Sequence, residues 1–258
     1  MSNIAQTYKR LRSSQKFQKR FGVAIRLIIA VILIAFSIFP VLWIVSASFD
    51  NANSLATQSL IPANAGIKNY QRLFNMDPNF SFGELNYWTW LWNSIKVSGI
   101  NTILGVSITT MAAYAFSRLR FKGRVPILKS ILLIQVFPNL LALVATFALV
   151  SNIGNIVPAL GLNTHAGLIM VYLGGSMGMN IWLVKGYMDT IPRDIDESAH
   201  VDGANDWQVF TKLILPLMRP ILVTIGILSF IGTYGDFLLA RVLLNESSKY
   251  TLMVGLQL

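Results

Sequence analysis

The chain has 258 residues, of which 54% are hydrophobic and only 12% charged, and it carries a formal net charge of +10 at pH 7. This composition excludes an ordinary soluble domain and predicts an integral membrane protein. The chain contains no cysteine, which excludes disulfides, thiolate nucleophiles and cysteine metal sites. The basic residues stand beside apolar segments and are not interleaved with base-stacking aromatics, so we expect no nucleic-acid partner.

Five apolar segments are each long enough to cross a bilayer core of about 30 Å, which needs about 20 helical residues. We therefore predict an all-α, polytopic helical bundle in a lipid bilayer with about five transmembrane helices, at residues 24–49, 92–117, 125–150, 164–186 and 221–240.

The N-terminal segment 1–23 is basic and contains no acid. The positive-inside rule then places the N-terminus on the cytoplasmic side of the membrane, which we expect to be a bacterial cell membrane. Residues 24–258 are expected to form a single transmembrane domain. Five passes place the segments between spans alternately on the two sides, with 51–91, 151–163 and 241–258 outside and 118–124 and 187–219 inside.

Polar side chains within predicted spans need a reason, because an aspartate at the bilayer centre costs about 2.5–3.5 kcal/mol. In the third span, Pro138 frees a backbone carbonyl, and Gln135 and Asn139 could satisfy it or face a water-filled cavity. We therefore predict a kinked helix that lines a translocation path. Asn180 and Asp236 are further candidates for this path, although water or a neighbouring helix near the outer membrane surface would also explain Asp236.

The fourth and fifth predicted spans contain several small residues. Gly174, Gly175 and Gly178 lie in the fourth, and Gly226, Ser229 and Gly232 lie in the fifth. Small residues allow close approach of membrane helices, so we expect these positions to be packing surfaces.

The segment 187–219 is a charged loop between two apolar segments, and its sequence predicts two short helices. Residues 195–201 are long enough for two helical turns, and Gly203 supplies the flexible backbone for a turn. Asn205 and Gln208 then have the spacing of a helix N-cap. The segment holds six acids and three bases, with Lys185 as a fourth base just before it, and an anionic inner leaflet repels acids, so we predict docking of a soluble basic partner. The acids are Asp189, Asp194, Asp196, Glu197, Asp202 and Asp206.

This loop resembles the cytoplasmic EAA loop of permease subunits of binding-protein-dependent ABC importers. The residues that carry the resemblance are Glu197, Ser198, Ala199, Asp202, Gly203, Ala204, Phe210, Leu215, Pro216 and Pro220. Residues 171–175, 179–187 and 250–257 are similar to the maltose/maltodextrin G-type branch of this family. The similarity extends over residues 21–258.

The resemblance implies a type I importer (MetI-like) permease fold that moves a sugar, maltose or maltodextrin, inward by alternating access. It implies four kinds of partner: a second, F-type permease, two ATPase subunits, an extracellular solute-binding protein and the sugar. The first six residues of the EAA list, from Glu197 to Ala204, would dock on an ATPase. Family members continue past Gln257 through a further span, which we expect to be absent here.

The chain has no P-loop, so we expect no cofactor in this chain, with ATP and Mg bound by the partner ATPases. We identify no catalytic residue and no metal site, and predict that the chain is not an enzyme. Two alternatives remain. An ion-gradient secondary transporter would show two related halves and paired acids within its spans. A truncated, non-transporting membrane assembly subunit would fit the missing last span.

Overall fold

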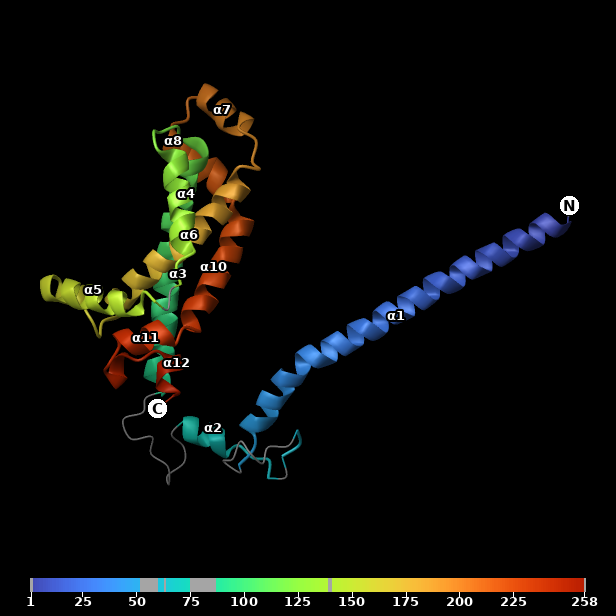
Figure 1. Ribbon diagram of the computed structural model, residues 1–258, viewed down its shortest axis with the longest axis horizontal. Coiled ribbons are helices and arrows are strands. Elements are labelled where there is room, and N and C mark those ends of the chain that lie inside the picture. The colour runs from blue at the N-terminus through green and yellow to red at the C-terminus, as the bar shows by residue number, and fades with distance from the viewer. Residues whose placement is uncertain (1, 52–59, 63, 75–86, 139–140, 258) are drawn as a thin grey trace. The chain divides into compact units, whose positions relative to one another are not determined.

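The computed structural model describes residues 2–51, 60–62, 64–74, 87–138 and 141–257. The chain divides into two compact units, Met1–Gly83 and Glu84–Leu258. Among the described residues every regular element is a helix, and the strand-like pairing is confined to an isolated bridge between Asp50 and Ala65 (Figure 1). The predicted all-helical class is confirmed.

The first unit consists of α1 (Ser2–Ser48) and α2 (Lys68–Leu73). The part of α1 from Phe21 to Ser48 is 28 residues long and has a mean hydropathy of 3.0. A helix of this length and composition can cross a bilayer core, which confirms the first predicted span. Asn69 of α2 donates hydrogen bonds to the backbone oxygens of Ser48 and Asp50, at 3.2 and 2.9 Å.

The second unit is built on three helices: α3 (Tyr87–Arg118), α6 (His165–Met188) and α10 (Arg219–Tyr234). α3 packs against both of the others, and α4 (Arg124–Gln135) packs against α6 (Figure 1). α3 buries a polar face that includes Asn93, Asn101 and Thr109, whereas Ile103 is 68% exposed. A membrane helix is expected to bury its polar face within the protein and to expose its apolar face to lipid. The predicted spans 92–117 and 164–186 are thereby confirmed.

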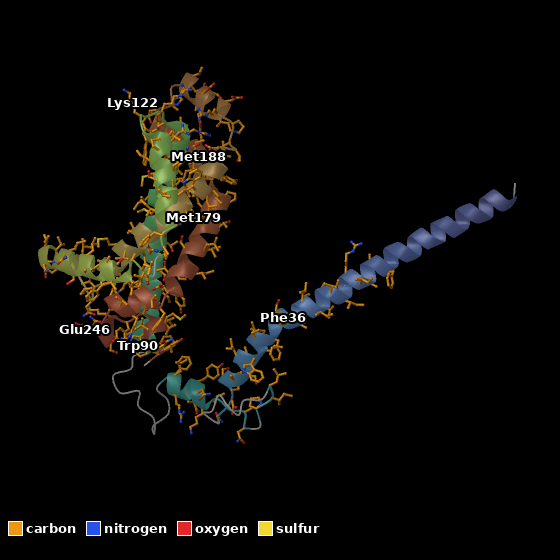
Figure 2. All side chains as sticks on the ribbon, viewed as in Figure 1. Phe36, Trp90, Lys122, Met179, Met188 and Glu246 are labelled. Carbon is orange, nitrogen blue, oxygen red and sulfur yellow. The ribbon has the colours of Figure 1, made fainter. Side chains whose placement is uncertain are left out.

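The unit has two distinct ends, shown in Figure 2 by Lys122 and Met188 at one end, Trp90 and Glu246 at the other, and Met179 between them. The first, which we name the α7 end, carries three short elements between α6 and α10. These are α7 (Asp194–Val201), α8 (Asp206–Gln208) and α9 (Leu215–Leu217), with a π-helical stretch at Val209–Ile214.

The opposite end, named the α12 end, carries α11 (Leu238–Leu243), a 3-10 turn (Ser247–Lys249) and α12 (Leu252–Gly255). Buried polar groups of α3 hold this segment. The Trp90 indole donates to Ser247 O at 2.8 Å, and Asn93 donates to Ser248 O and Tyr250 O, both at 3.0 Å.

The third predicted span, 125–150, is wrong as a single helix. The chain forms α4 and a separate α5 (Leu143–Ile156), followed by a 3-10 turn at Pro158–Leu160. Helices of 12 and 14 residues are about 18 and 21 Å long, which is less than a bilayer core. Pro138 lies in the break, and a proline disfavours helical backbone in the residue before it. The two helices run in different directions (Figure 1).

The fifth predicted span is too long at its C-terminal end. α10 stops at Tyr234, and the Asp236 carboxylate then accepts hydrogen bonds from the backbone N–H groups of Leu239 and Ala240, at 3.1 and 3.2 Å. Capping of this kind starts a new helix instead of continuing the old one. Among the described residues three helices can cross a membrane, or four if Asp206–Leu217 and Arg219–Tyr234, bent by 74°, form one span. The prediction of five is corrected accordingly.

Candidate functional site

The loop at the α7 end folds largely as its sequence predicts. α7 covers Asp194–Val201, one residue longer than predicted at its start. Gly203 has φ +86°, a left-handed conformation that favours glycine and lets the chain turn away from α7. Asn205 and Gln208 form the predicted cap as a reciprocal box, with bonds of 3.0 and 2.9 Å between each side chain and the other's backbone N–H.

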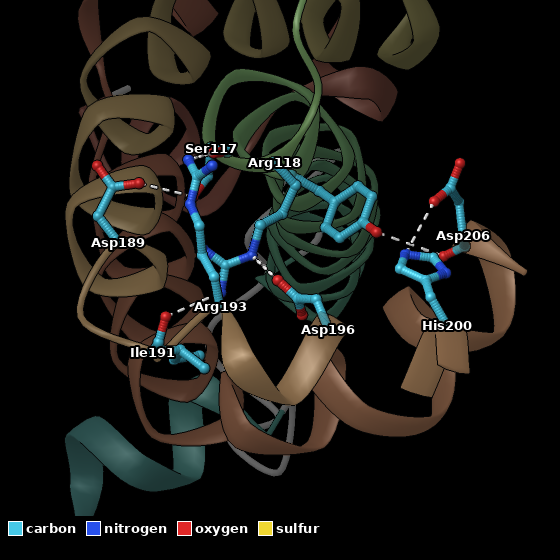
Figure 3. A network of polar contacts seen from close by, with 9 residues as sticks. Ser117, Arg118, Asp189, Ile191, Arg193, Asp196, His200 and Asp206 are labelled. Carbon is cyan, nitrogen blue, oxygen red and sulfur yellow. Dashed lines mark hydrogen bonds and ion pairs between the residues drawn. The ribbon is translucent and has the colours of Figure 1, made fainter. Parts of the chain in front are cut away.

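A buried ion pair joins α7 to the end of α3. Arg118 Nε lies 2.5 Å from Asp196 Oδ2, and the two side chains are only 7% and 12% exposed (Figure 3). Arg118 Nη2 also donates to the backbone oxygen of Ile191 at 3.0 Å, which fixes the approach to α7. Removing one member of such a pair leaves an unpaired buried charge and costs about 3–5 kcal/mol.

Three further residues continue this connection to α6. Arg193 Nη2 donates to Ser117 O at 3.0 Å, and Ser117 Oγ donates to Asp189 Oδ1 at 2.6 Å. Asp189 also pairs with Lys185 at 2.5 Å. Burial raises the pKa of the Asp189 carboxyl, but hydrogen bonds from Lys185 and Ser117 and nearby positive charge outweigh burial, so the pKa is lowered. We name this group of residues the clasp: Ser117, Arg118, Asp189, Arg193 and Asp196.

The clasp holds α7 in a fixed position on the helical bundle. It connects the short helix to the last turn of α3 and to the end of α6 through charged and backbone contacts. These contacts are directional and sit in a partly dry environment, where electrostatic interactions are stronger than in water. Displacement of α7 is therefore expected to displace the ends of both long helices.

The residues predicted to dock on a partner do not all face outward. Glu197, Ser198, Asp202 and Gly203 are exposed, and Ala204 is half-buried. Ala199 is only 9% exposed and packs into the core beneath α7. Ala199 therefore anchors α7 on the bundle and offers no surface to a partner.

The charge of the loop surface is smaller than the sequence count indicates. Asp189 and Asp196 belong to the clasp, which leaves Asp194, Glu197, Asp202 and Asp206 as exposed acids without a clasp contact. Asp206 lies 3.5 Å from the His200 ring.

Two apolar side chains on this surface are exposed, and the sequence reasoning proposed neither as a docking residue. Val201 is 88% exposed and Trp207 is 65% exposed. Asp194, Glu197 and Val201 stand at spacings of three and four residues and therefore share one face of α7. That spacing could have identified Val201. The loop surface is consequently both acidic and apolar.

A cavity of about 830 Å³ lies farther along the bundle. Its walls come from α3, α5, α6, α10 and the start of α11. Two of the predicted path residues, Asn180 and Asp236, line it. Gln135 does not: its amide donates to Gly175 O at 3.4 Å and lies against Gly178, where it connects α4 to α6. Asn139 lies outside the described residues.

Comparison with known proteins identifies the family. Residues 105–257 match the family of binding-protein-dependent transport system inner membrane components. The chain belongs to this family.

The maltose/maltodextrin transport system permease protein MalG of Vibrio vulnificus strain YJ016 is 47% identical over 225 residues, which are 85% of this chain and 75% of the relative. MalG of Escherichia coli K12 is 40% identical over 235 residues, covering 89% and 79%. Among solved structures, a chain from a bacterial ABC transporter involved in import of the acidic polysaccharide alginate aligns with a TM-score of 0.76 at 25% identity, covering 92% of this chain and 79% of that one.

These matches confirm the resemblance drawn from the EAA residues and the type I (MetI-like) permease fold. The chain is a permease subunit of the ABC importer class. Its relatives are transport subunits, in line with the prediction that it is not an enzyme. In this permease, the acidic and apolar surface of α7 and the cavity between the long helices are the two candidate functional sites.

The buried pair gives a stability prediction for the permease. Asp196→Ala leaves the Arg118 charge unpaired and should lower the free energy of unfolding by about 3–5 kcal/mol. Asp194→Ala is the matched control, because Asp194 is exposed on the same helix and its loss should cost less than about 1 kcal/mol. Thermal unfolding in detergent, followed by circular dichroism, measures both. Equal losses in the two variants would contradict the assigned role of the clasp.

Proposed function

We propose that this chain is the membrane-spanning permease subunit of an ATP-driven importer that carries maltose or a maltodextrin into the cell. The MalG relatives, at 40–47% identity over most of the chain, support this cargo. The basic N-terminal segment supports an orientation with the N-terminus and the α7 end in the cytoplasm. The α12 end then faces outward, toward a solute-binding protein that delivers the sugar.

The energy source belongs to partner subunits. The sequence has no P-loop, so ATP and Mg are held by two ATPase subunits that dock at the α7 end. A second, F-type permease completes the pathway through the membrane. Lys122 lies at the α7 end (Figure 2), in a run that also contains Arg118, Arg120 and Arg124, and by the positive-inside rule these bases support a cytoplasmic position for that end.

The clasp is the observation that carries this proposal. ATP-driven movement of the ATPases pushes on the exposed face of α7, at Glu197, Val201 and Asp202. α7 is held to α3 by the Arg118–Asp196 pair and by the bond from Arg193 to Ser117 O, and Ser117 in turn joins α3 to Asp189 at the end of α6. The push therefore tilts the long helices. Helix rearrangement then opens the cavity alternately to the two sides of the membrane.

The chemistry of the exposed face fits a cleft that is basic and partly apolar. Val201 and Trp207 would bury their exposed apolar surface against the partner, and this burial provides binding affinity. Glu197 and Asp202 would meet basic residues, which provides register and orientation. A lipid surface fits less well, since its anionic headgroups repel these acids.

Charge reversal tests the docking face. Glu197→Lys should weaken association with the ATPase subunits about tenfold, which corresponds to about 1.4 kcal/mol. The control is Glu246→Lys, the same reversal at an exposed position near the α12 end. Pull-down of the ATPase by tagged permease, titrated at moderate salt, measures the difference. Equal recovery with both variants would show that an acid at position 197 plays no part in docking.

Transport itself is tested with the assembled importer. ATP-dependent uptake of radiolabelled maltotriose should occur when the partner permease, ATPases and binding protein are present, and should stop on ATP depletion. It should persist when ion gradients are dissipated by ionophores. Loss of uptake under ionophores with ATP intact would favour a secondary transporter, and absence of uptake with all partners present would favour an assembly subunit.

A further inference from the structure

The turn between α3 and α4 concentrates positive charge that the transport mechanism leaves without a role. Four bases occur in the seven residues 118–124, and Lys129 follows on α4. Lys122 marks this turn at the α7 end (Figure 2). The sequence contains no acid between Glu84 and Asp189, so no neighbour along the chain can neutralise these bases. Their counter-charge has to come from elsewhere.

The fold supplies that counter-charge to only one base of the turn. Arg118 belongs to the clasp, in which it pairs with Asp196. The others form no ion pair among the described residues: Arg120, Lys122, Arg124 and Lys129. Asp189 is close enough to Arg124 for their charges to interact, but its carboxylate already bonds to Lys185 and Ser117. Because like charges repel one another, an external anion would stabilise the turn.

The turn encloses a shallow hollow of about 350 Å³. Two guanidinium groups, a glycine and apolar side chains line it: Arg120, Phe121, Gly123, Arg124, Val125 and Pro126. Gly123 has φ +88°, a left-handed conformation that favours glycine, and the turn brings Arg120 and Arg124 to the same hollow. A planar guanidinium donates paired hydrogen bonds to phosphate oxygens, so two of them at one hollow fit a phosphate group.

An exposed and mainly apolar face of α4 continues from the hollow. Val125, Lys129, Leu133 and Val136 follow one another at spacings of four, four and three residues, so they share this face. The three apolar side chains are 59%, 74% and 79% exposed in chain order. The opposite side of α4 packs on α6, where Leu128 is buried. The 12 residues of α4 are about 18 Å long, close to the depth of one leaflet, so an acyl chain can lie along the exposed face.

The hollow lies at the level of the lipid headgroups. α3 is long and apolar enough to cross the membrane, and it ends at Arg118, so the turn that follows lies at a membrane surface. In the proposed orientation this is the cytoplasmic surface. Anionic lipids give that surface a negative potential, and basic pockets near it bind their headgroups.

We propose that the α3–α4 turn is a binding site for an anionic phospholipid. Arg120 and Arg124 bind the phosphate of the headgroup, and one acyl chain lies along the exposed face of α4. Lys129 has a long, flexible side chain that can extend its ammonium group toward the same headgroup. The site lies two residues from Arg118 of the clasp, so a bound lipid also holds the end of α3 to which α7 is fixed. The inference goes beyond the proposed function, because no part of it involves the cargo.

The combination of charge and apolar surface favours a lipid over other anions. A soluble phosphate would bind only the two guanidinium groups and would gain nothing from the apolar face of α4. An acidic surface of the ATPase subunits is a further candidate. However, the ATPase cleft that accepts the acidic α7 surface is expected to be basic, and it would repel the bases of this turn.

Photolabelling tests the site directly. The assembled importer is placed in phosphatidylcholine nanodiscs that contain a phosphatidylglycerol with a diazirine in its acyl chain. Mass spectrometry of the digested chain should locate adducts mainly in residues 119–136, with a yield that saturates as the fraction of this lipid rises. A phosphatidylcholine that carries the same diazirine should label these residues weakly and without saturation. An equal, saturating yield from phosphatidylcholine would exclude recognition of the anionic headgroup.

Removal of the two guanidinium groups tests the headgroup contact. Arg120→Gln combined with Arg124→Gln should raise the phosphatidylglycerol fraction that gives half-maximal labelling about tenfold. The matched control is Lys212→Gln combined with Arg219→Gln, which removes two exposed bases elsewhere at the α7 end and should leave that fraction unchanged. Retained weak labelling by the phosphatidylcholine analogue shows that each variant still presents α4 to lipid.

Three further outcomes would overturn the site. Equal loss of labelling in the two double variants would show a general attraction of the basic surface to the membrane. Loss of labelling in excess inorganic phosphate would identify a soluble anion as the occupant. Labelling of the isolated chain but not of the assembled importer would show that a partner subunit covers the turn. Sugar uptake plays no part in these measurements, so a failure of transport would count against the proposed function alone.

Discussion

The buried pair between Arg118 and Asp196 is the interaction on which the rest of the second unit depends for its function. It lies where a surface helix of eight residues meets the end of a 32-residue helix. A short exposed helix has little intrinsic stability, because most helical stability in proteins comes from packing. The clasp, with Ala199 and the core beneath α7, gives this helix a fixed position. A force on α7 can then reach the bundle without being lost in local unfolding.

The arrangement separates three tasks along the second unit. The α7 end presents acidic and apolar side chains on a rigidly held helix. The middle encloses a cavity whose polar groups include side chains of α3, α6 and α10. At the α12 end, Trp90 and Asn93 hold the segment after α10 by bonds to its backbone oxygens. Because α3 runs through all three regions, rearrangement of this one helix couples them.

Local sequence signals predicted much of this fold. Hydrophobic length predicted α3 and α6, and the spacing of Asn205 and Gln208 predicted the cap after Gly203. The break between α4 and α5 could not be predicted, because a proline restricts its predecessor without deciding whether the helix kinks or stops. The clasp was also beyond sequence reasoning: Arg118 and Asp196 are distant in sequence, and each reads as an ordinary loop charge. Ser229, Thr233 and Asp236, which line the cavity, recur at spacings of four and three residues, but the sequence reasoning assigned Ser229 to helix packing and named only Asp236 as a path candidate.

The central claim is that α7 and the end of α3 move as one body during transport. Replacing Arg118 and Asp196 with cysteines, in a chain that otherwise has none, allows them to be joined by a short bifunctional thiol reagent. ATP-driven maltotriose uptake by the assembled importer should be impaired in the unlinked double variant and restored by cross-linking, since the link replaces the lost ion pair. Uptake that is abolished by the cross-link, while the ATPases remain bound, would show that α7 must move relative to α3 and would contradict the account.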